Sequence, residues 1–177
     1  MIRPVLVYPH PMLRRTSEPV EFAEHHLPGR QQLAEDLLDT LEDQHGLGLS
    51  AIQIGVPLRV IAIVNGAHGP EVLWNPTICG GGAGPFVRVK EGCLSFPDVF
   101  IMVPRSSIAS VTYQNEHGEA RWLDLGGTAA QAIQHEIEHL DGHLLIDHTK
   151  GAQRQLVVQR LKRFMRKTRK TGKRVSL

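Results

Sequence analysis

Hydrophobic residues recur at helical spacing in residues 29–45, where four leucines share one face of a predicted amphipathic helix. Gly46 follows this segment and is expected to end the helix. Residues 150–170 have a second apolar face, which stands among arginines and lysines and consists of Leu156, Val157, Leu161 and Phe164. Both segments are therefore predicted to be helices with one buried side.

A third helix is predicted from Thr128, its expected N-cap, to about residue 141. Ile133, Ile137 and Leu140 give this helix an apolar face, which favours a buried rather than a peripheral position. Gly142 follows and is expected to end it.

Five stretches have the residue types of β-strands, namely residues 59–65, 71–76, 85–90, 107–114 and 119–125. The sequence NEHG at residues 115–118 separates the last two stretches and predicts a hairpin. The sequence GGGAG at residues 80–84 predicts a turn.

The length of 177 residues suits one domain with a full-sized core. No apolar run approaches the roughly 18 residues needed to span a bilayer, and the first 15 residues lack the apolar core of a signal peptide. A cytoplasmic location is therefore expected. In that compartment Cys79 and Cys93 are expected to stay reduced, free to act as core residues, nucleophiles or metal ligands.

Charge is distributed unevenly along the chain. Residues 1–149 hold 9 Lys and Arg against 18 Asp and Glu, which gives a net charge of −9. Residues 150–177 hold 11 Lys and Arg and no acid, which gives +11. Such a basic segment after an acidic body indicates a polyanionic partner, although a solvated helix surface is the ordinary alternative.

The predicted third helix carries the sequence HEIEH, with His135 and His139 four residues apart and Glu136 after the first. On a helix these two imidazoles lie on the same face, as metal ligands would. A solvated helix face with two surface histidines is the alternative. Burial favours the metal, because buried imidazoles and carboxylates need partners.

A catalytic metal usually has three protein ligands and one open position. The chain has no glutamate after Glu138, and the position ten residues after the first histidine is Leu145. Asp141 and Asp147 remain possible ligands, but Cys93, at the end of a predicted strand, is the better candidate. The alternative for Cys93, and the one favoured for Cys79, is a small buried hydrophobic residue.

Three motifs occur in order: GLGLSAIQ at residues 46–53, EGCLS at 91–95 and QHEIEH at 134–139. In these the chain resembles the peptide deformylases, whose motifs are GxGLAAxQ, EGCLS and QHExDH. YPHPMLRR at residues 8–15 and VPR at 103–105 are also similar to family positions. The resemblance runs from about residue 5 to residue 148, and three motifs in order make it specific.

The resemblance implies a metal-dependent hydrolase that removes the N-formyl group from newly synthesised formyl-methionyl chains and releases formate. The implied metal ligands are Cys93, His135 and His139. The implied catalytic groups are Glu136 as general acid and base, with the Gln53 amide and the Leu94 N–H as donors to the developing oxyanion. Four further positions are expected to contact the substrate: Gly46, Gly48, Glu91 and Gly92.

The resemblance also implies a cofactor and partners. One divalent ion is expected, natively Fe²⁺, with Ni²⁺, Co²⁺ or Zn²⁺ also able to occupy the site. The expected partners are N-formylmethionyl nascent peptides and, through the basic C-terminal segment, ribosomal RNA. The chain is expected to be a monomer without a membrane partner.

Several residues depart from the family pattern. Ser50 replaces an alanine and can bond back to the chain. Glu138 replaces an aspartate that orients its neighbours. Thr128 and Gln131 stand where larger aliphatic residues usually line the methionine pocket, and PDVF at residues 97–100 differs from the commoner forms. The preference for substrate side chains is therefore the property least fixed by the resemblance.

Pattern and resemblance together predict an α+β fold, with antiparallel β-sheets around a central HExxH helix and a C-terminal helix. Residues 1–149 are expected to form the catalytic domain, and residues 150–177 a basic helix or tail within that domain or beyond it. Two rival functions stay open. One is a zinc endopeptidase, and the other is a nucleic-acid-binding protein whose metal is structural.

Overall fold

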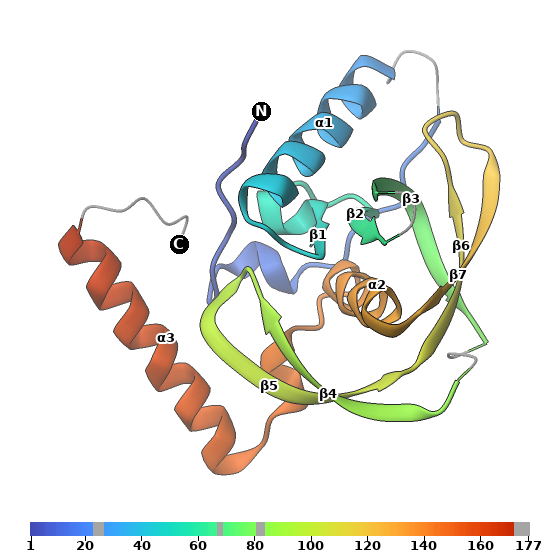
Figure 1. Ribbon diagram of the computed structural model, residues 1–177. Coiled ribbons are helices and arrows are strands. Elements are labelled where there is room, and N and C mark those ends of the chain that lie inside the picture. Colours follow the sequence, from blue (N-terminus) through green and yellow to red (C-terminus); the bar gives the residue numbers. More distant parts are fainter. Residues whose placement is uncertain (23–26, 67–68, 81–83, 172–177) are drawn as a thin grey trace.

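The computed structural model describes residues 1–22, 27–66, 69–80 and 84–171, and these form an α+β fold of helices and antiparallel sheets (Figure 1). Its helices and strands are α1 (Leu27–Asp43), β1 (Gly48–Ser50), β2 (Val60–Asn65), β3 (Gly69–Cys79), β4 (Phe86–Cys93), β5 (Phe96–Ser106), β6 (Ile108–Gln114), β7 (Ala120–Gly126), α2 (Gly127–Leu140) and α3 (Gly151–Thr171). The described residues also form the short 3₁₀ helices η1 (Pro11–Arg14), η3 (Ala51–Ile54) and η4 (Leu145–His148). The predicted fold class is confirmed.

The larger sheet is antiparallel and has the strand order β1-β2-β3-β6-β7. On strand β2, Val60 and Ala62 pack in a cluster with leucines of α1, whereas Ile61 and Ile63 pack in a cluster with α2. Alternate residues of a strand point to opposite faces, and here each face is covered by a helix. This two-sided burial explains the unbroken apolar run that predicted the strand.

The hairpin at residues 115–118 is confirmed, because β6 and β7 pair on either side of it, and the N–H of Asn115 donates to the carbonyl of Glu119 at 3.0 Å. The helix predicted at residues 29–45 is also present, as α1. Within the predicted turn at residues 80–84, residues 81–83 lie outside the described part of the chain.

The expected N-cap of α2 is wrong. The N-cap is Gly126, and Thr128 lies inside the helix. Gly127 has φ +57, a conformation that favours glycine, and its N–H donates to the carbonyl of Ser107 at 3.3 Å. A contact with the β5–β6 connection, rather than a side-chain cap, therefore fixes where this helix begins.

The smaller sheet pairs β4 with β5, and β5 was not predicted. Pro97 and Pro104 lie within this strand, and proline disfavours the interior of a sheet. A two-stranded sheet leaves one edge of each strand unpaired, so the missing N–H groups are tolerated. Along β5, Val99, Ile101 and Val103 are buried, while the residues between them face outward.

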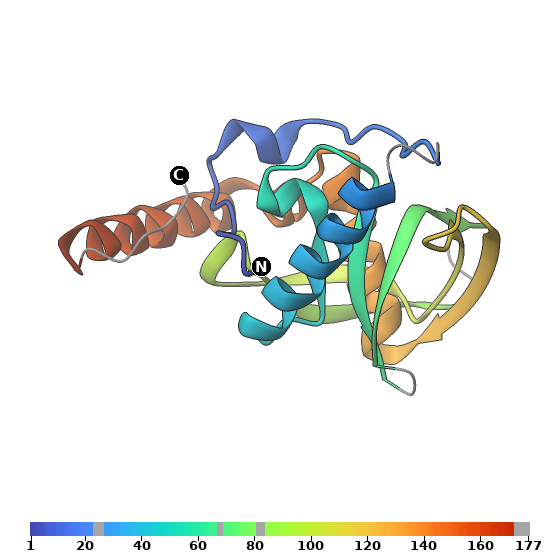
Figure 2. The same cartoon turned by 90° about the horizontal axis from the view of Figure 1, so that it is seen from above.

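Helix α3 packs on the smaller sheet through Val157 and Leu161, which share a core cluster with residues of β5 and η4. The prediction that Leu156 belongs to the apolar face is wrong, because its side chain is 55% exposed. Each residue turns a helix by 100°, so a face centred on residues 157 and 161 excludes 156 and takes in Val158 instead. Figure 2 shows the far end of α3 extending away from the rest of the molecule.

None of the described helices is both long and apolar enough to cross a bilayer.

Candidate metal centre

Helix α2 presents His135 and His139 on one face, one turn apart. Their ring centroids lie 4.9 Å from each other, and the ring planes are inclined by 82°. Both side chains are buried, because Ile133, Ile137 and Leu140 hold the helix against the larger sheet. The apolar stripe thus fixes the rotation of α2 and, with it, the direction of both imidazoles.

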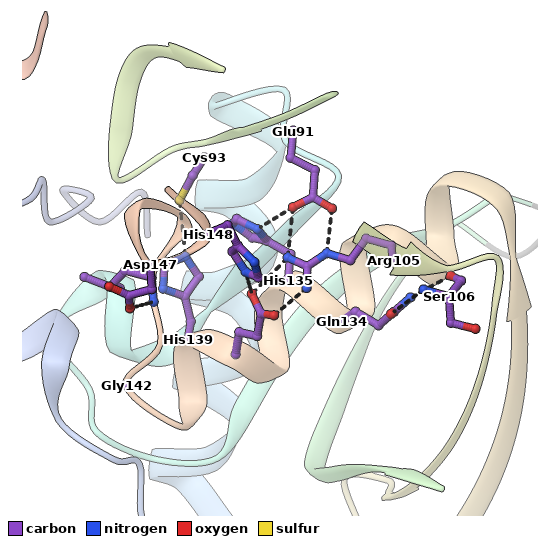
Figure 3. Close-up of polar contacts among 12 residues, drawn as sticks. Glu91, Cys93, Arg105, Ser106, Gln134, His135, His139, Gly142, Asp147 and His148 are labelled. Carbon is purple, nitrogen blue, oxygen red and sulfur yellow. Dashed lines mark hydrogen bonds and ion pairs between the residues drawn. The ribbon is translucent and has the colours of Figure 1, made fainter. Parts of the chain in front are cut away.

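Cys93 reaches these imidazoles from the end of β4, where a two-residue turn (residues 94–95) leads into β5. Its Sγ lies 3.2 Å from Nε2 of His139. One ligand atom from each of Cys93, His135 and His139 can be chosen so that all three lie within 4.8 Å of one another. The structure therefore brings together the thiol and the two imidazoles that the sequence singled out, as Figure 3 shows.

The two aspartates considered as alternative ligands are engaged elsewhere. A carboxylate oxygen of Asp141 accepts a hydrogen bond from Arg59 at 2.7 Å. Asp147 accepts one from Nη2 of Arg14 at 2.9 Å. Neither residue belongs to the cluster of possible metal ligands found among the described residues.

Glu91 fixes the orientation of the His135 imidazole through a contact with Nδ1. Its Oε2 lies 3.2 Å from Nδ1 of His135, so the ring can donate there and leave Nε2 free (Figure 3). Burial opposes the charged form of Glu91, but the hydrogen bonds from His135 and Arg105 outweigh it and lower the pKa of the carboxyl to about 2. Glu91 is therefore ionised and held in place beside the imidazole.

Arg105 connects Glu91 to Glu138. The guanidinium donates to both oxygens of Glu91, at 2.8 and 2.9 Å, and to both oxygens of Glu138, at 2.5 and 2.9 Å. Glu138 also meets Nε2 of His148 at 2.9 Å. From the sequence, Arg105 was assigned no role beyond its place in the VPR motif. Its inward position follows from the alternation along β5, a strand that was not predicted.

The two histidines of the cluster have opposite shifts in pKa. For His135, burial lowers the pKa, but the nearby Cys93 and Glu91 outweigh it and raise the pKa well above the ordinary value. For His139, burial and the neighbouring His135 lower the pKa well below that value. A single positive charge shared by these groups would therefore sit on His135.

Glu136 is buried next to this cluster and faces the glycine-rich segment before η3. A Cβ added to Gly48 would lie 2.7 Å from Cγ and 2.8 Å from Oε1 of Glu136, so only glycine fits at this position. Burial is the main cause that raises the pKa of Glu136 to about 7, with a smaller contribution from Glu91. A carboxyl that titrates near neutrality can both take up and release a proton.

Gln53, in η3, is held so that its amide nitrogen points toward Cys93. Its Oε1 accepts from the N–H of Ser50 at 2.9 Å and from the Ser50 hydroxyl at 3.0 Å. Its Nε2 donates to Oγ of Ser95 at 3.1 Å and lies 3.7 Å from Sγ of Cys93. The hydroxyl of Ser50, expected to bond to the chain, bonds instead to the Gln53 side chain and helps to fix it.

A pocket of about 450 Å³ opens onto these residues. It is lined by every residue that the sequence assigned to the site except His139, that is by Gly46, Gly48, Gln53, Glu91, Gly92, Cys93, Leu94, His135 and Glu136. Thr128, Gln131 and Ala132 extend its wall along the first two turns of α2. The arrangement is a cluster of potential ligands with a buried carboxyl, beside a pocket large enough for a peptide terminus.

Comparisons with known proteins show which family the chain is similar to. A family model described as polypeptide deformylase matches residues 2–155. The chain is 40% identical over 168 residues to a peptide deformylase of Bartonella tribocorum, with 92% of each chain covered. It is 38% identical over 167 residues to one of Mesorhizobium japonicum, covering 92% of this chain and 93% of the other. The crystal structure of a peptide deformylase from Legionella pneumophila superposes with a TM-score of 0.85 at 34% identity, over 94% of this chain and 96% of that one.

Proposed function

We propose that this chain, which belongs to the polypeptide deformylase family, holds one divalent metal ion through Cys93, His135 and His139. It is a hydrolase that removes the formyl group from the N-terminal methionine of newly made polypeptides. The observation that supports the metal proposal is the convergence of one thiol and two imidazoles, from elements far apart in the sequence, within 4.8 Å.

The residues present fit a divalent ion. One thiolate and two imidazoles are a ligand set that iron, cobalt, nickel and zinc all accept, and three protein ligands leave a position open. Beside this cluster, Oε2 of Glu136 is one of the buried polar atoms of the described residues that have no hydrogen-bond partner. Orphaned atoms of this kind are expected where a substrate, an ion or a water belongs. We propose Fe²⁺ as the native ion, with Ni²⁺, Co²⁺ and Zn²⁺ as functional substitutes.

When bound, the ion supplies Lewis acidity, which lowers the pKa of a water and polarises the formyl carbonyl. Glu136 takes the proton of the attacking water and returns it to the leaving amine, because its pKa of about 7 suits both directions. Glu91 and Arg105 keep the His135 ring in the orientation that ligation needs.

Negative charge on the formyl oxygen is met by donors that the chain orients in advance. The amide of Gln53 is fixed by Ser50 and Ser95 and points its nitrogen toward the cluster. The N–H of Leu94 lies in the turn directly after Cys93 and is the second donor in this proposal. Gly46, Gly48, Glu91 and Gly92 border the same pocket. They are the positions proposed to contact the peptide.

Formate release from formyl-Met-Ala-Ser by anaerobically prepared enzyme tests the whole proposal, with metal content measured on the same sample. We expect turnover with one metal ion per chain, loss of the ion in Cys93→Ser, and loss of turnover with the ion retained in Glu136→Ala. Cleavage inside an unblocked peptide would favour an endopeptidase instead. Nucleic-acid binding by a metal-replete sample without turnover would favour a binding protein with a structural metal.

We further propose that α3 meets ribosomal RNA through exposed basic side chains, namely Arg160, Lys162, Arg163 and Arg166. Residues 172–177, which add two more basic residues, lie outside the described part of the chain.

Because Val157 and Leu161 belong to the core, truncating α3 would disturb the fold. The triple variant Arg160→Gln, Arg163→Gln, Arg166→Gln is the cleaner test. We expect it to co-sediment less with ribosomes, and we expect wild-type binding to weaken as salt rises. Binding that ignores both changes would contradict this proposal.

Three smaller expectations complete this proposal. Residues 1–149 form the catalytic unit with α3 packed against it, the enzyme works as a monomer, and its compartment is the cytoplasm where nascent chains emerge. Size-exclusion chromatography at working concentration tests the oligomeric state, and a dimer would overturn that part alone.

A further inference from the structure

The mouth of the pocket has an exposed aromatic side chain that the proposed chemistry does not use. Phe100, on β5, is 58% exposed, although it lines the same pocket as Cys93, His135 and Glu136. Leu47 lines this pocket as well and is 55% exposed. Of the large hydrophobic side chains that are exposed in the described residues, these two alone border the pocket. Exposed apolar surface that continues a binding pocket indicates an interaction site.

The Phe100 ring is held in place by its neighbours on β4. Phe100 pairs with Gly92 in the antiparallel register, and a Cβ added to Gly92 would lie 2.8 Å from Cε1 of the ring. The ring therefore rests on the bare backbone of Gly92. The Nζ of Lys90, two residues earlier on the same face, lies 5.2 Å from the ring centroid. The ring thus needs little ordering when a ligand covers its remaining surface.

The position of the ring relative to Cys93 limits which part of a peptide can reach it. Gly92 directly precedes Cys93, and antiparallel partners are about 5 Å apart, so the ring lies on the order of 10 Å from the thiol. An extended peptide advances about 3.3 Å per residue. If the formyl group lies at the metal cluster, the side chains of the second and third residues are those that extend as far as Phe100.

We propose that Phe100 is a specificity-determining residue that binds an apolar side chain at one of the two positions after the methionine. This inference rests on the proposed function, because it assumes a formylated peptide whose terminus lies at Cys93. Burial of two apolar surfaces against each other drives the contact, and Lys90 limits the area of this contact because its ammonium lies over the ring.

The test compares formyl-Met-Leu-Ser, formyl-Met-Ser-Leu and formyl-Met-Ser-Ser. We expect one of the leucine peptides to have a kcat/KM about tenfold above that of the serine peptide. In Phe100→Ser this ratio should fall toward one, and Phe100→Leu should keep most of it. Trp122→Ala is the matched control, because Trp122 on β7 is 57% exposed, does not line the pocket, and should leave the ratio unchanged.

Three results would overturn the inference: equal rates for all three peptides, a leucine preference that survives Phe100→Ser, or an equal loss in Trp122→Ala. Binding of the unformylated peptides Met-Leu-Ser, Met-Ser-Leu and Met-Ser-Ser, measured by calorimetry, gives the same ratio without turnover. Should no peptide release formate, the proposed function fails, and the ratio of dissociation constants still decides the role of Phe100. Should formyl-Met-Ser-Ser turn over without any leucine preference in rate or binding, only the inference about Phe100 fails.

Discussion

Helices α2 and α3 both carry an apolar stripe, but the polar residues of α2 are buried, whereas those of α3 are exposed. Helix α2 buries His135, Glu136 and His139, whose exposed fractions are 8%, 3% and 1%. On α3 the arginines and lysines between residues 154 and 166 are exposed, and apolar side chains such as Val157 and Leu161 make its buried face. Figure 1 shows the same contrast in position, with α2 surrounded by strands and α3 at the periphery.

Buried and exposed polar side chains contribute differently to the free energy of folding. Buried polar groups cost free energy unless partners meet them, so those of α2 are retained together with a network that satisfies them. Exposed charges on α3 are solvated by water and add little to stability. Substitutions of polar residues should therefore be severe around α2 and mild on α3, whereas substitutions of apolar residues should matter on both helices.

The largest effect is expected at Glu136. Glu136→Gln keeps the size of the side chain but removes its ability to carry a proton, so formate release should fall about 10³-fold. The metal content should not change, because the proposed ligands are intact. Formate production and metal analysis on the same sample check both statements, and Glu116→Gln, in the exposed turn between β6 and β7, is the control. More than a tenth of the wild-type rate in Glu136→Gln would remove this residue from the chemistry.

The second effect concerns the buried charges behind the site. Arg105→Ala leaves Glu91 and Glu138 without their shared guanidinium, and the free energy of unfolding should fall by about 3–5 kcal/mol. Urea unfolding of the metal-free protein measures this loss. Arg121→Ala is the control, because the side chains of the Arg121–Glu119 pair are 50% and 56% exposed, and its loss should lower the free energy of unfolding far less than the loss of Arg105. Similar losses in the two variants would contradict the contrast between buried and exposed charge.

The third effect compares two leucines on α3 itself. Leu161 is 2% exposed and Leu156 is 55% exposed. Leu161→Ala should lower the free energy of unfolding by about 2–4 kcal/mol, because it removes buried surface and leaves a cavity. Leu156→Ala should change it by less than about 0.5 kcal/mol. Thermal or urea unfolding of both variants checks the register of the helix, and equal losses would restore Leu156 to the buried face.

The behaviour of α2 was largely predictable from sequence, whereas that of its surroundings was not. Helical spacing marked the apolar stripe of α2, and the stripe determined which way His135 and His139 point. The start of the helix was misplaced because it depends on the hydrogen bond from Gly127 to Ser107, a contact between separate elements. Local patterns describe a helix face well, but they carry no information on what that face meets.

The same limit explains the misses at β5 and Arg105. Two prolines hid an eleven-residue strand, since the sequence does not reveal that its edges are unpaired. Without the strand, the inward direction of Arg105 could not be inferred, nor its position between Glu91 and Glu138, which are 14 and 33 residues away. On α3, residues 156 and 157 were equally plausible because the helix has apolar residues in succession, and only packing on β5 distinguishes them.

The smallest effect is expected at the ion pair between Arg14 and Asp147, which lies between the two extremes in exposure. The side chains are 39% and 30% exposed, and Asp147 also accepts a hydrogen bond from the N–H of Leu144 at 2.9 Å. Burial alone would raise the pKa of Asp147, but the hydrogen bonds from Arg14 and Leu144 outweigh it and hold the pKa below its ordinary value. A carboxyl with a lowered pKa stabilises the folded state above its unfolded pKa, and this contribution is lost as the pH falls through the folded value.

Asp147→Asn should therefore lower the free energy of unfolding by about 1 kcal/mol at pH 7, and the difference from wild type should shrink as the pH falls from 5 toward 3. Urea unfolding of both proteins across this range measures it. Asp124→Asn, at a fully exposed carboxyl on β7, should change the free energy of unfolding less at pH 7. A difference that stays constant with pH would mean that Asp147 acts through shape rather than charge. A decrease in the free energy of unfolding as large as that of Arg105→Ala would mean that solvent does not screen this partly exposed pair. Exposure would then not explain why the buried charges matter more.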